Sequence, residues 1–442
     1  MKAAFFSKRM TAGWVTALLI GLLAAFTPWL DRLRPMRTGE QAGSQFYVTS
    51  GDDGGTGSLR EAIFKADRTD GRVRVSIDTP TITLTSALPP IINATGIVID
   101  TLRPGVQIDA SRMTDGPVLD VASPNAVISG VAIIGARAQA VLLRANGARL
   151  SGMRIQRSAV GVFAMDDVSG LRINDSEFDR NGIGIQLGAR SADVQVRRNR
   201  FRRHDKAAIW SVAPVAPSAP SSAAVDITAN AFDGDETSIV LINGGARVEQ
   251  NTFIRAHTAS VLVTGSSVSL RGNRMQSSFG FGINAAELNH AVITDNEINH
   301  NCGGGILVRE TRGSQIAMNR LYANGYGIVV VLGTNDSPNN IVNNTVMRSA
   351  VDGLYVIGAS PVIRGNRLLA NEKSGLHLSS LQSRGRAAVE SRPFVEANVL
   401  AGNGADVPVA DAFRVGAGET PAVLQDCAWR GGSSDDVGGQ LQ

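Results

Sequence analysis

The sequence predicts an all-β solenoid of roughly 12 coils. The first basis is a phrase that recurs across residues 128–400 at steps of 21 to 32 residues. The phrase is an aliphatic residue, two variable positions, usually Asn, one variable position and a large apolar residue, as at residues 196–201 and 293–298. A period of this size is typical of stacked structural repeats, and the longest steps are explained by insertions.

The second basis is a local period of two residues. Aliphatic and polar residues alternate over runs such as residues 194–197, which indicates strands. A further apolar strand lies between successive Asn phrases and often starts after Gly, as at Gly305 and Gly327. Each coil is therefore expected to have three short strands, with coils stacked in parallel. The Asn column suits turns, because Asn tolerates left-handed backbone angles and its amide can bond to the coils above and below. The Leu offsets of leucine-rich repeats are not present.

With these phrases the sequence resembles the right-handed parallel β-helix proteins of the pectate-lyase-like superfamily, which includes polysaccharide epimerases and many surface proteins. The resemblance covers most of the chain and implies a right-handed parallel β-helix solenoid, but it leaves function open.

Residues 46–100 resemble the leader with the sequence Cys-Ser-Leu-Arg-Glu-Ala that precedes bacterial β-helices, with Gly57 where that leader often has Cys. Ser58 and Glu61 form a capping box that predicts a helix through Ala66. An amphipathic helix here would cover the open end of the first coil.

Composition agrees with a long β solenoid. The 442 residues are 43% apolar and 5% aromatic and include 48 Gly, as expected for a narrow aliphatic interior and many turns. The net charge of +4 comes almost wholly from Arg and indicates an anionic partner. Two cysteines, Cys302 and Cys427, exclude a disulfide scaffold, and whether they pair stays open. The five His show no close metal-ligand spacing, so no metal or cofactor is expected.

The N-terminus predicts a membrane anchor. Residues 11–30 are about twenty uncharged, largely apolar residues, enough to span a bilayer. A cleavable signal peptide, which would make the protein secreted, is the alternative, but no good small-x-small cleavage site is present. We expect inner-membrane anchoring, and the habit of the resembled proteins implies a periplasmic β-helix. The expected organisation is an anchor at 1–30, a linker at 31–44, a cap at 45–66, the β-helix at 67–405, and a C-terminal cap and tail at 406–442.

Outward positions on the strands flanking the Asn turn are rich in Arg. Coils stack roughly 4.8 Å apart, so these residues predict a basic face suited to a polymer with repeating carboxylates or phosphates. The candidate binding residues are Arg200, Arg274, Arg320 and Arg367, with Arg154, Arg172, Arg197, Arg247, Arg271 and Arg364 on the same strand pair. Interleaved Glu residues leave a merely solvated face as the alternative. Nucleic acid is not expected, because stacking aromatics are absent.

The Gly-introduced strand predicts an apolar outward column. Its members are Leu142, Phe163, Val240, Leu262, Leu307, Val329, Tyr355 and His377, with Trp210 nearby. Such a stripe marks a contact surface for a loop, a second chain or sugar rings. Phe163 and Trp210 are the candidate sugar-binding aromatics.

The best candidate for chemistry lies at the C-terminal end of this column. Tyr355 and His377 are expected on adjacent coils, with Arg309 in the next outward row two coils back. The neighbouring cations are Lys373 and, on an insertion at 379–393, Arg384 and Arg386. Breaking or epimerising a uronic acid requires a cation on its carboxylate, a base for the C5 proton and often a proton donor. Arg309 or Arg384, His377 and Tyr355 could fill these roles, and a solvent-exposed His and Tyr is the alternative.

Other polar clusters carry less weight. His204, Asp205 and Lys206 are interpreted as a charged turn. Asp166 and Asp167 are a weak candidate for a catalytic carboxylate pair, because the side chains of adjacent residues point in different directions. The Asp-Pro-His of mannuronan epimerases, the Gly-His-Gly of polygalacturonases and the acidic calcium cluster of pectate lyases are missing, which leaves open whether the protein is an enzyme.

Two functions therefore remain. The first is a membrane-tethered extracytoplasmic protein that binds, and as a lyase or C5-epimerase modifies, an anionic polysaccharide in exopolysaccharide assembly or export. The second is a non-enzymatic structural or adhesive β-helix that contacts a protein partner through its apolar stripe.

Overall fold

The protein is described by a computed structural model that covers residues 43–213, 225–265, 267–333, 336–383, 387–407 and 409–415. The chain divides into two units, Met1–Gly43 and Ser44–Gln442, and all the described strands lie in the second. The predicted anchor, Arg384, Arg386 and Cys427 lie outside the described residues. Within the described part, no helix is long and apolar enough to cross a membrane.

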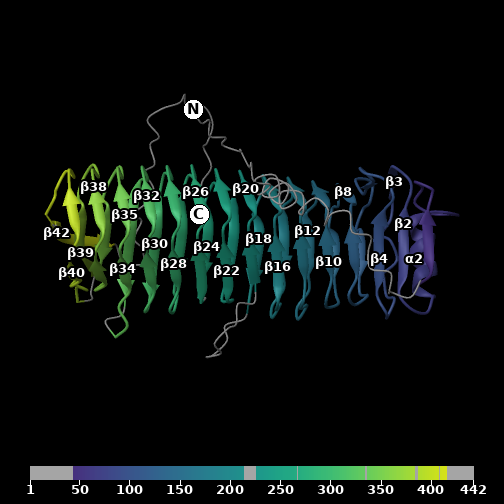
Figure 1. Ribbon diagram of the computed structural model, residues 1–442, viewed down its shortest axis with the longest axis horizontal. Coiled ribbons are helices and arrows are strands. Elements are labelled where there is room, and N and C mark those ends of the chain that lie inside the picture. Colours follow the sequence, from purple (N-terminus) through teal and green to yellow (C-terminus); the bar gives the residue numbers. More distant parts are fainter. Residues whose placement is uncertain are drawn as a thin grey trace, which may run out of the picture. The chain divides into compact units, whose positions relative to one another are not determined.

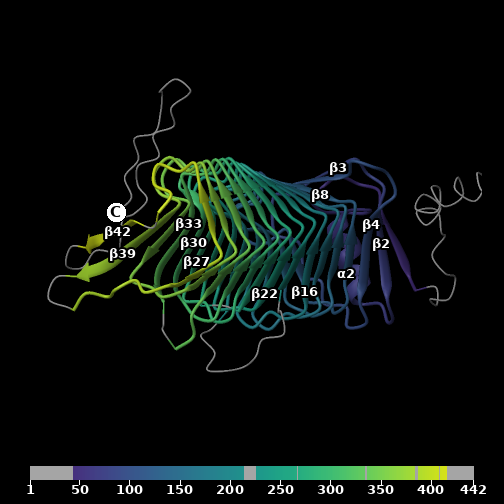
Figure 2. The ribbon, with the colours of Figure 1, turned by 60° about the vertical axis from the view of Figure 1, so that its left-hand side comes forward.

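The described strands form three sheets of 15, 14 and 13 strands, and all paired strands within them run parallel (Figure 1). From β4 onward each coil contributes one strand to each sheet, and the turns of successive coils align (Figure 2). The predicted right-handed parallel β-helix is therefore confirmed. The estimate of roughly 12 coils was slightly low, because the strands before residue 122 precede the first Asn phrase.

Sheet A contains β1 (Gln45–Val48), β2 (Val73–Ile77), β4 (Ile97–Thr101), β7 (Val127–Ser129), β10 (Arg149–Ser151), β13 (Arg172–Asn174), β16 (Val194–Arg197), β19 (Val225–Thr228), β22 (Ala246–Glu249), β25 (Val268–Arg271), β28 (Val292–Thr294), β31 (Gln315–Ala317), β34 (Asn340–Val342), β37 (Val362–Arg364) and β40 (Phe394–Glu396). Sheet B contains β3 (Thr81–Thr83), β5 (Gln107–Asp109), β8 (Ala132–Ile134), β11 (Arg154–Gln156), β14 (Glu177–Asp179), β17 (Arg200–Arg202), β20 (Ala231–Asp233), β23 (Thr252–Ile254), β26 (Arg274–Gln276), β29 (Glu297–Asn299), β32 (Arg320–Tyr322), β35 (Thr345–Met347), β38 (Arg367–Leu369) and β41 (Val399–Ala401). Sheet C contains β6 (Leu119–Val121), β9 (Gln139–Leu143), β12 (Val160–Ala164), β15 (Ile183–Leu187), β18 (Ala207–Val212), β21 (Thr237–Ile242), β24 (Ala259–Thr264), β27 (Phe281–Ala286), β30 (Gly304–Thr311), β33 (Tyr326–Gly333), β36 (Leu354–Ile357), β39 (Leu376–Ser383) and β42 (Val409–Val415).

The interior is a column of aliphatic and aromatic side chains. Strand alternation points every second residue inward, and these residues form one continuous buried cluster. On sheet B the inward column includes four phenylalanines, Phe178, Phe201, Phe232 and Phe253, whose rings stack with centroids 5.0, 4.9 and 4.7 Å apart. Identical side chains on successive coils therefore pack face to face along the stack.

The Asn column at the turn between sheets A and B forms a hydrogen-bonded ladder. Asn251 donates its backbone N–H and Nδ2 to Oδ1 of Asn273 at 3.0 and 3.1 Å, and Nδ2 also donates to the carbonyl of Ile227 at 2.8 Å. The same pattern links Asn230 to Asn251 and Asn296 to Asn319. The predicted bonding between coils is thus confirmed.

The prediction that these Asn residues adopt a left-handed backbone conformation was wrong, because the residue one position earlier adopts it. The positive φ belongs to the residue before each ladder Asn, for example 56° at Gln250 and 53° at Arg198. The ladder Asn therefore has an ordinary backbone conformation, and its buried carboxamide, not its tolerance of positive φ, explains its recurrence.

The predicted N-terminal helix is α2 (Leu59–Asp67). Ser58 Oγ accepts a hydrogen bond from the backbone N–H of Glu61 at 3.2 Å, while the Glu61 carboxylate accepts one from Gly57 N–H at 2.7 Å. The helix buries Leu59, Ile63 and two alanines against β1 and β2. It therefore covers the end of the interior, as predicted, while the resemblance to the bacterial leader stays a prediction.

Replacing Asn251 by Ala tests the ladder. The substitution leaves the buried N–H of Asn230 and C=O of Ile227, both on the preceding coil, without their side-chain partner, so we expect the free energy of unfolding to fall by about 1–3 kcal/mol. Urea denaturation followed by circular dichroism measures this change. Asn289→Ala, at an exposed position, is the control and should change stability by less than about 0.5 kcal/mol. Equal effects of the two substitutions would contradict a stabilising ladder.

Candidate functional site

Tyr355 and His377 lie side by side on the outer face of sheet C. They are register partners on β36 and β39, and their rings stack with centroids 4.4 Å apart and planes inclined by 22°. The hydroxyl of Tyr355 also lies 3.0 Å from Ser379 Oγ. The predicted adjacency on neighbouring coils is therefore confirmed.

A carboxylate that the sequence analysis missed orients His377. Nδ1 of His377 lies 3.0 Å from Oδ2 of Asp352, and Oδ1 of Asp352 accepts the backbone N–H of Ser374 at 3.0 Å. Because a carboxylate only accepts hydrogen bonds, a neutral His377 carries its proton on Nδ1 and its lone pair on Nε2. The Asp352 side chain is 3% exposed and that of His377 17%.

Asp352 was missed because it lies in the turn before β36, outside the recurring phrase. The signal that could have found it is its place at a strand entry one coil before His377. We call Asp352, Tyr355 and His377 the sheet C cluster.

Tyr326 packs against this cluster. Its ring stacks on that of Tyr355 with centroids 6.1 Å apart. Burial, and secondarily the negative charge of Asp352, raise the pKa of the Tyr326 phenol. Together with Tyr326, the sheet C cluster is thus a partly desolvated group of two phenols, an imidazole and a carboxylate.

The expected apolar outward column is real, but much of it is not exposed. Strand register places its members in a single row from Leu142 to His377, interrupted by Gln186 and Asn284. Val329 and Tyr355 are only 0% and 6% exposed. Tyr355 belongs to a second apolar cluster on the outer face that includes Leu307 and Val329. The alternative of a simply solvent-exposed Tyr and His does not hold.

Phe163 and Trp210 lie in this row, two coils apart, and are partly exposed. Phe163 is nine coil rises from His377, roughly 43 Å. The structure therefore does not bring the candidate sugar-binding aromatics together with the sheet C cluster, and only a long polymer could contact both.

Arg309 lies where the sequence predicted. It pairs with Val331, which pairs with Ile357 two residues beyond Tyr355, so Arg309 is in the next outward row two coils back. Its Nε is buried and makes no hydrogen bond within the described residues. Lys373 is exposed just before β39.

The candidate polymer-binding arginines share one outward column of sheet B. Register places Arg200, Arg274, Arg320 and Arg367 in the same row, together with Arg154. All are exposed. Arg274 is paired with Glu297 at 3.0 Å, whereas Arg200, Arg320 and Arg367 make no ion pair among the described residues.

The candidate arginines of sheet A differ, because each of the five has an acidic partner. Arg172 pairs with Asp193 at 2.8 Å, Arg271 with Asp295 at 3.3 Å, and Arg364 with Glu396 at 2.7 Å. Arg197 and Arg247 are paired similarly with Asp226 and Glu249. Sheet A is therefore a mixed-charge face, and among the candidate arginines those without an ion pair in the described residues, Arg200, Arg320 and Arg367, lie on sheet B.

The predicted catalytic and polymer-binding residues consequently occupy different sheets. His377 faces outward from sheet C, and Arg367, on the same coil, faces outward from sheet B. The two sets of residues therefore lie on separate surfaces of the solenoid and do not line a common cleft.

The interpretation of residues 204–206 as a charged turn was wrong for His204. Its side chain is fully buried, and Nδ1 lies 2.7 Å from the equally buried Asp235. Nε2 lies 3.4 Å from Asn181 Nδ2. His204 therefore replaces an Asn in a second interior polar column, while Asp205 and Lys206 are exposed.

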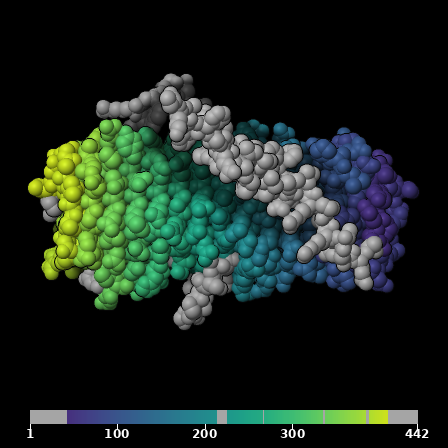
Figure 3. All heavy atoms as spheres, in the orientation of Figure 1, coloured from purple at the N-terminus to yellow at the C-terminus, as the bar shows by residue number. Residues whose placement is uncertain are grey.

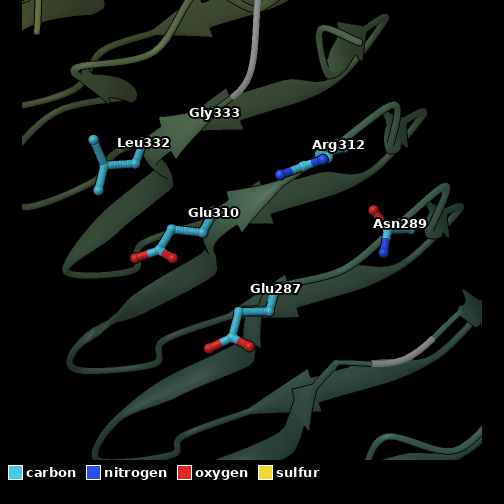
Figure 4. Close-up of a pocket in the computed structure, with 6 residues that line it drawn as sticks. All are labelled: Glu287, Asn289, Glu310, Arg312, Leu332 and Gly333. Carbon is cyan, nitrogen blue, oxygen red and sulfur yellow. The ribbon is translucent and has the colours of Figure 1, made fainter. Parts of the chain in front are cut away.

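A hollow of about 630 Å³ lies at the end of the sheet C strands (Figure 4). Glu287 and Glu310 stand on successive coils and extend in the same direction, with Arg312 and Asn289 beside them. All four are exposed, so this group forms a solvated polar rim. No group of three or more potential metal ligands occurs in the described part of the chain.

Comparisons with known proteins agree with the fold. A family profile described as "Right handed beta helix region" matches residues 218–368. No curated protein matches the chain. The solved structures that are similar include the A-module of the mannuronan C-5 epimerase AlgE6 of Azotobacter vinelandii, with 13% identity and a TM-score of 0.51 over 85% of this chain and 100% of that one.

A thermostable GH87 α-1,3-glucanase of Streptomyces thermodiastaticus is similar at 16% identity and a TM-score of 0.47, covering 85% of this chain and 71% of that one. A tailspike protein mutant of E. coli bacteriophage HK620, solved with a pentasaccharide, is similar at 11% identity and a TM-score of 0.48, covering 70% and 71%. At 13% identity the match to the epimerase module establishes the fold alone.

Asp352→Asn tests the electrostatics of the sheet C cluster. Removing the negative charge should lower the pKa of Tyr326, while burial keeps it above its ordinary value. Titration of the Tyr326 ring by NMR measures the shift. Glu372→Gln, which removes an exposed carboxylate from the same coil as His377, is the control and should leave the titration unchanged. An unchanged Tyr326 pKa in Asp352→Asn would contradict this arrangement.

Proposed function

We propose that the protein is a membrane-tethered, extracytoplasmic β-helix that binds an anionic polysaccharide during exopolysaccharide assembly or export. The observation that carries the proposal is the sheet B column, where exposed arginines without ion-pair partners in the described residues share one row. Arg320 and Arg367 are two coils apart, roughly 9.6 Å. An extended chain of acidic sugars can meet such guanidinium groups one after another, and the planar guanidinium suits carboxylates.

The tether and the periplasmic location rest on residues 1–30, which lie outside the described residues. Their apolar length is the support for this part of the proposal.

The sheet C cluster supports chemistry on the same class of polymer. His377 Nε2 would take the C5 proton of a uronate, and Arg309 or Lys373 would neutralise the charge that develops on the carboxylate. In a lyase the C5–H electron pair forms a C4=C5 bond, the C4–O bond breaks, and Tyr355 protonates the leaving oxygen. In an epimerase a proton returns to C5 from the opposite face. The likeness to a mannuronan C-5 epimerase concerns only the fold, so the residues carry this step of the proposal.

The alternative is a structural or adhesive β-helix that contacts a protein through the apolar column of sheet C. The observation that favours it is the length of that column, which is broken only by Gln186 and Asn284 between Leu142 and His377. Such an apolar row suits a protein surface as well as sugar rings.

Binding is tested with the triple variant in which Arg200, Arg320 and Arg367 are replaced by Gln. Each exposed charge contributes about 0.5 kcal/mol, so retention on immobilised polygalacturonate or polymannuronate should weaken about tenfold. The interaction should also weaken as salt is added.

The matched control replaces three ion-paired arginines of sheet A, Arg172, Arg271 and Arg364, by Gln. It removes the same formal charge but should change retention little, because these guanidinium groups already have acidic partners. Equal loss in both variants would mean that only net charge matters, and salt-insensitive retention would contradict the proposal.

Catalysis is tested by incubating acidic polymers with the protein in D2O. Both lyase and epimerase break the C5–H bond, so NMR should show an unsaturated uronate or deuterium at C5. His377→Gln and Tyr355→Phe should each lower the rate by about 10²–10⁴-fold.

His300→Gln and Tyr322→Phe are the matched controls, because these two rings are also in contact, edge to face with centroids 5.5 Å apart, but on the sheet B side. They should leave the rate unchanged. Binding without any C5 exchange on the whole panel of polymers would favour a non-catalytic protein.

A further inference from the structure

A hollow of about 710 Å³ lies over the turns between sheets A and B in the N-terminal coils. Two successive coils have Gly at the left-handed turn position here. Gly130 and Gly152 have φ of 73° and 59° and are exposed. The next two coils carry Asp175 and Arg198 at the same position. The missing side chain of Gly152 leaves the space, whereas a Cβ at Gly130 would meet Thr101 Oγ1 at 2.6 Å.

One wall of the hollow is apolar and the other is basic. Leu102, 53% exposed, and Pro104 follow β4 and form the apolar wall, while Arg103 between them is paired with Asp78 at 3.0 Å. Arg154 and Arg200 project from β11 and β17 on the opposite side. Glu177 lies between these two arginines and is shared by Arg154 at 3.4 Å and by Arg202 at 3.3 Å.

An ion pair between Arg198 and Asp175 closes the far end of the hollow, and the charges of these two side chains cancel. Arg198 donates two hydrogen bonds of 2.8 Å to the Asp175 carboxylate, and this bonding raises the pKa of Arg198. Arg200, two residues away, makes no ion pair within the described residues. The charge available to a ligand in the hollow is therefore that of Arg200, with Arg154 shared with Glu177.

We propose that this hollow binds one hexuronic acid unit of an anionic oligosaccharide, an inference that rests on the proposed function and gives it a defined starting point. The ring packs its C–H face on Leu102 and Pro104, and its carboxylate pairs with Arg154, which is two coil rises or roughly 9.6 Å along the stack. Arg200 lies two coil rises further and pairs with the carboxylate of the next unit. The ring fits over Gly152 because no side chain occupies that turn. The rest of the polymer then follows the sheet B column toward Arg367.

The direct test fills the hollow with a side chain. Gly152→Asn suits it, because Asn tolerates a positive φ and a Cβ at this position meets no atom nearer than 3.8 Å. Gly272→Asn is the matched control: it has the same place in the turn, a φ of 63° and a nearest contact of 3.9 Å, but lies outside the hollow. Calorimetry with trigalacturonate should show at least fivefold weaker binding for Gly152→Asn and unchanged binding for Gly272→Asn.

A second pair of variants tests the charge. Arg200→Gln should weaken trigalacturonate binding at least tenfold, whereas Arg367→Gln, in the same column but outside the hollow, should leave it unchanged. Both should weaken retention of the long polymer. Neutral maltotriose should bind at least tenfold more weakly than trigalacturonate.

The outcomes separate the hollow from the proposed function. If the polymer binds but trigalacturonate does not, binding of a sugar unit in the hollow is contradicted while polymer binding stands. The same holds if Gly152→Asn and Gly272→Asn bind trigalacturonate equally well. Equal binding of maltotriose overturns the carboxylate contact. If no acidic polymer binds at all, the proposed function fails and the hollow fails with it.

Discussion

The bonding of each Asn carboxamide to the next coil is the constraint on which the rest of the structure depends. Asn251 is satisfied only if its coil stacks in register on the coils of Asn230 and Asn273, because a shift would leave buried polar groups without partners. This register converts a loosely repeated sequence into straight columns of side chains. Figure 3 shows the coils as successive bands along the described part of the solenoid. Arg320 and Tyr355 each lie in such a column, and Gly152 leaves a gap in the row of turn residues.

Columns give the solenoid separate surfaces. On sheet B, guanidinium groups recur at multiples of the coil rise, which matches a long flexible polymer better than a compact ligand. On sheet C, packing of Tyr326, Tyr355 and His377 over the buried carboxylate of Asp352 creates a local, partly desolvated group. One short ligand cannot touch Arg367 and His377 together, because they face outward from different sheets. Binding and chemistry are therefore separable by mutation.

Much of this could be predicted from the sequence. The Asn phrase and the alternation of apolar residues were enough to place Arg274 and Arg320 in one row and Tyr355 beside His377, since strand register preserves positions along the phrase. The ion pairs could not be predicted, because the neutralisation of Arg271 by Asp295 depends on side-chain reach between coils. Asp352 was missed because it lies in a turn, where no period identifies it.

The hollow at Gly130 and Gly152 was also beyond prediction, because these are two of 48 glycines and only the register shows that they are adjacent. His204 was misjudged for a related reason. Its neighbours Asp205 and Lys206 are polar, but its own position in the coil points inward toward Asp235. Local composition indicates a surface, whereas the column position decides burial.

Hydrogen exchange of the whole chain, with and without polygalacturonate, tests the central claim that the polymer lies along the sheet B column. The account predicts slower amide exchange in the turns between sheets A and B, beginning at the coils of Gly130 and Gly152 and continuing toward Arg367. Slowing confined to the outer face of sheet C, or no slowing under conditions in which the polymer binds, would contradict it.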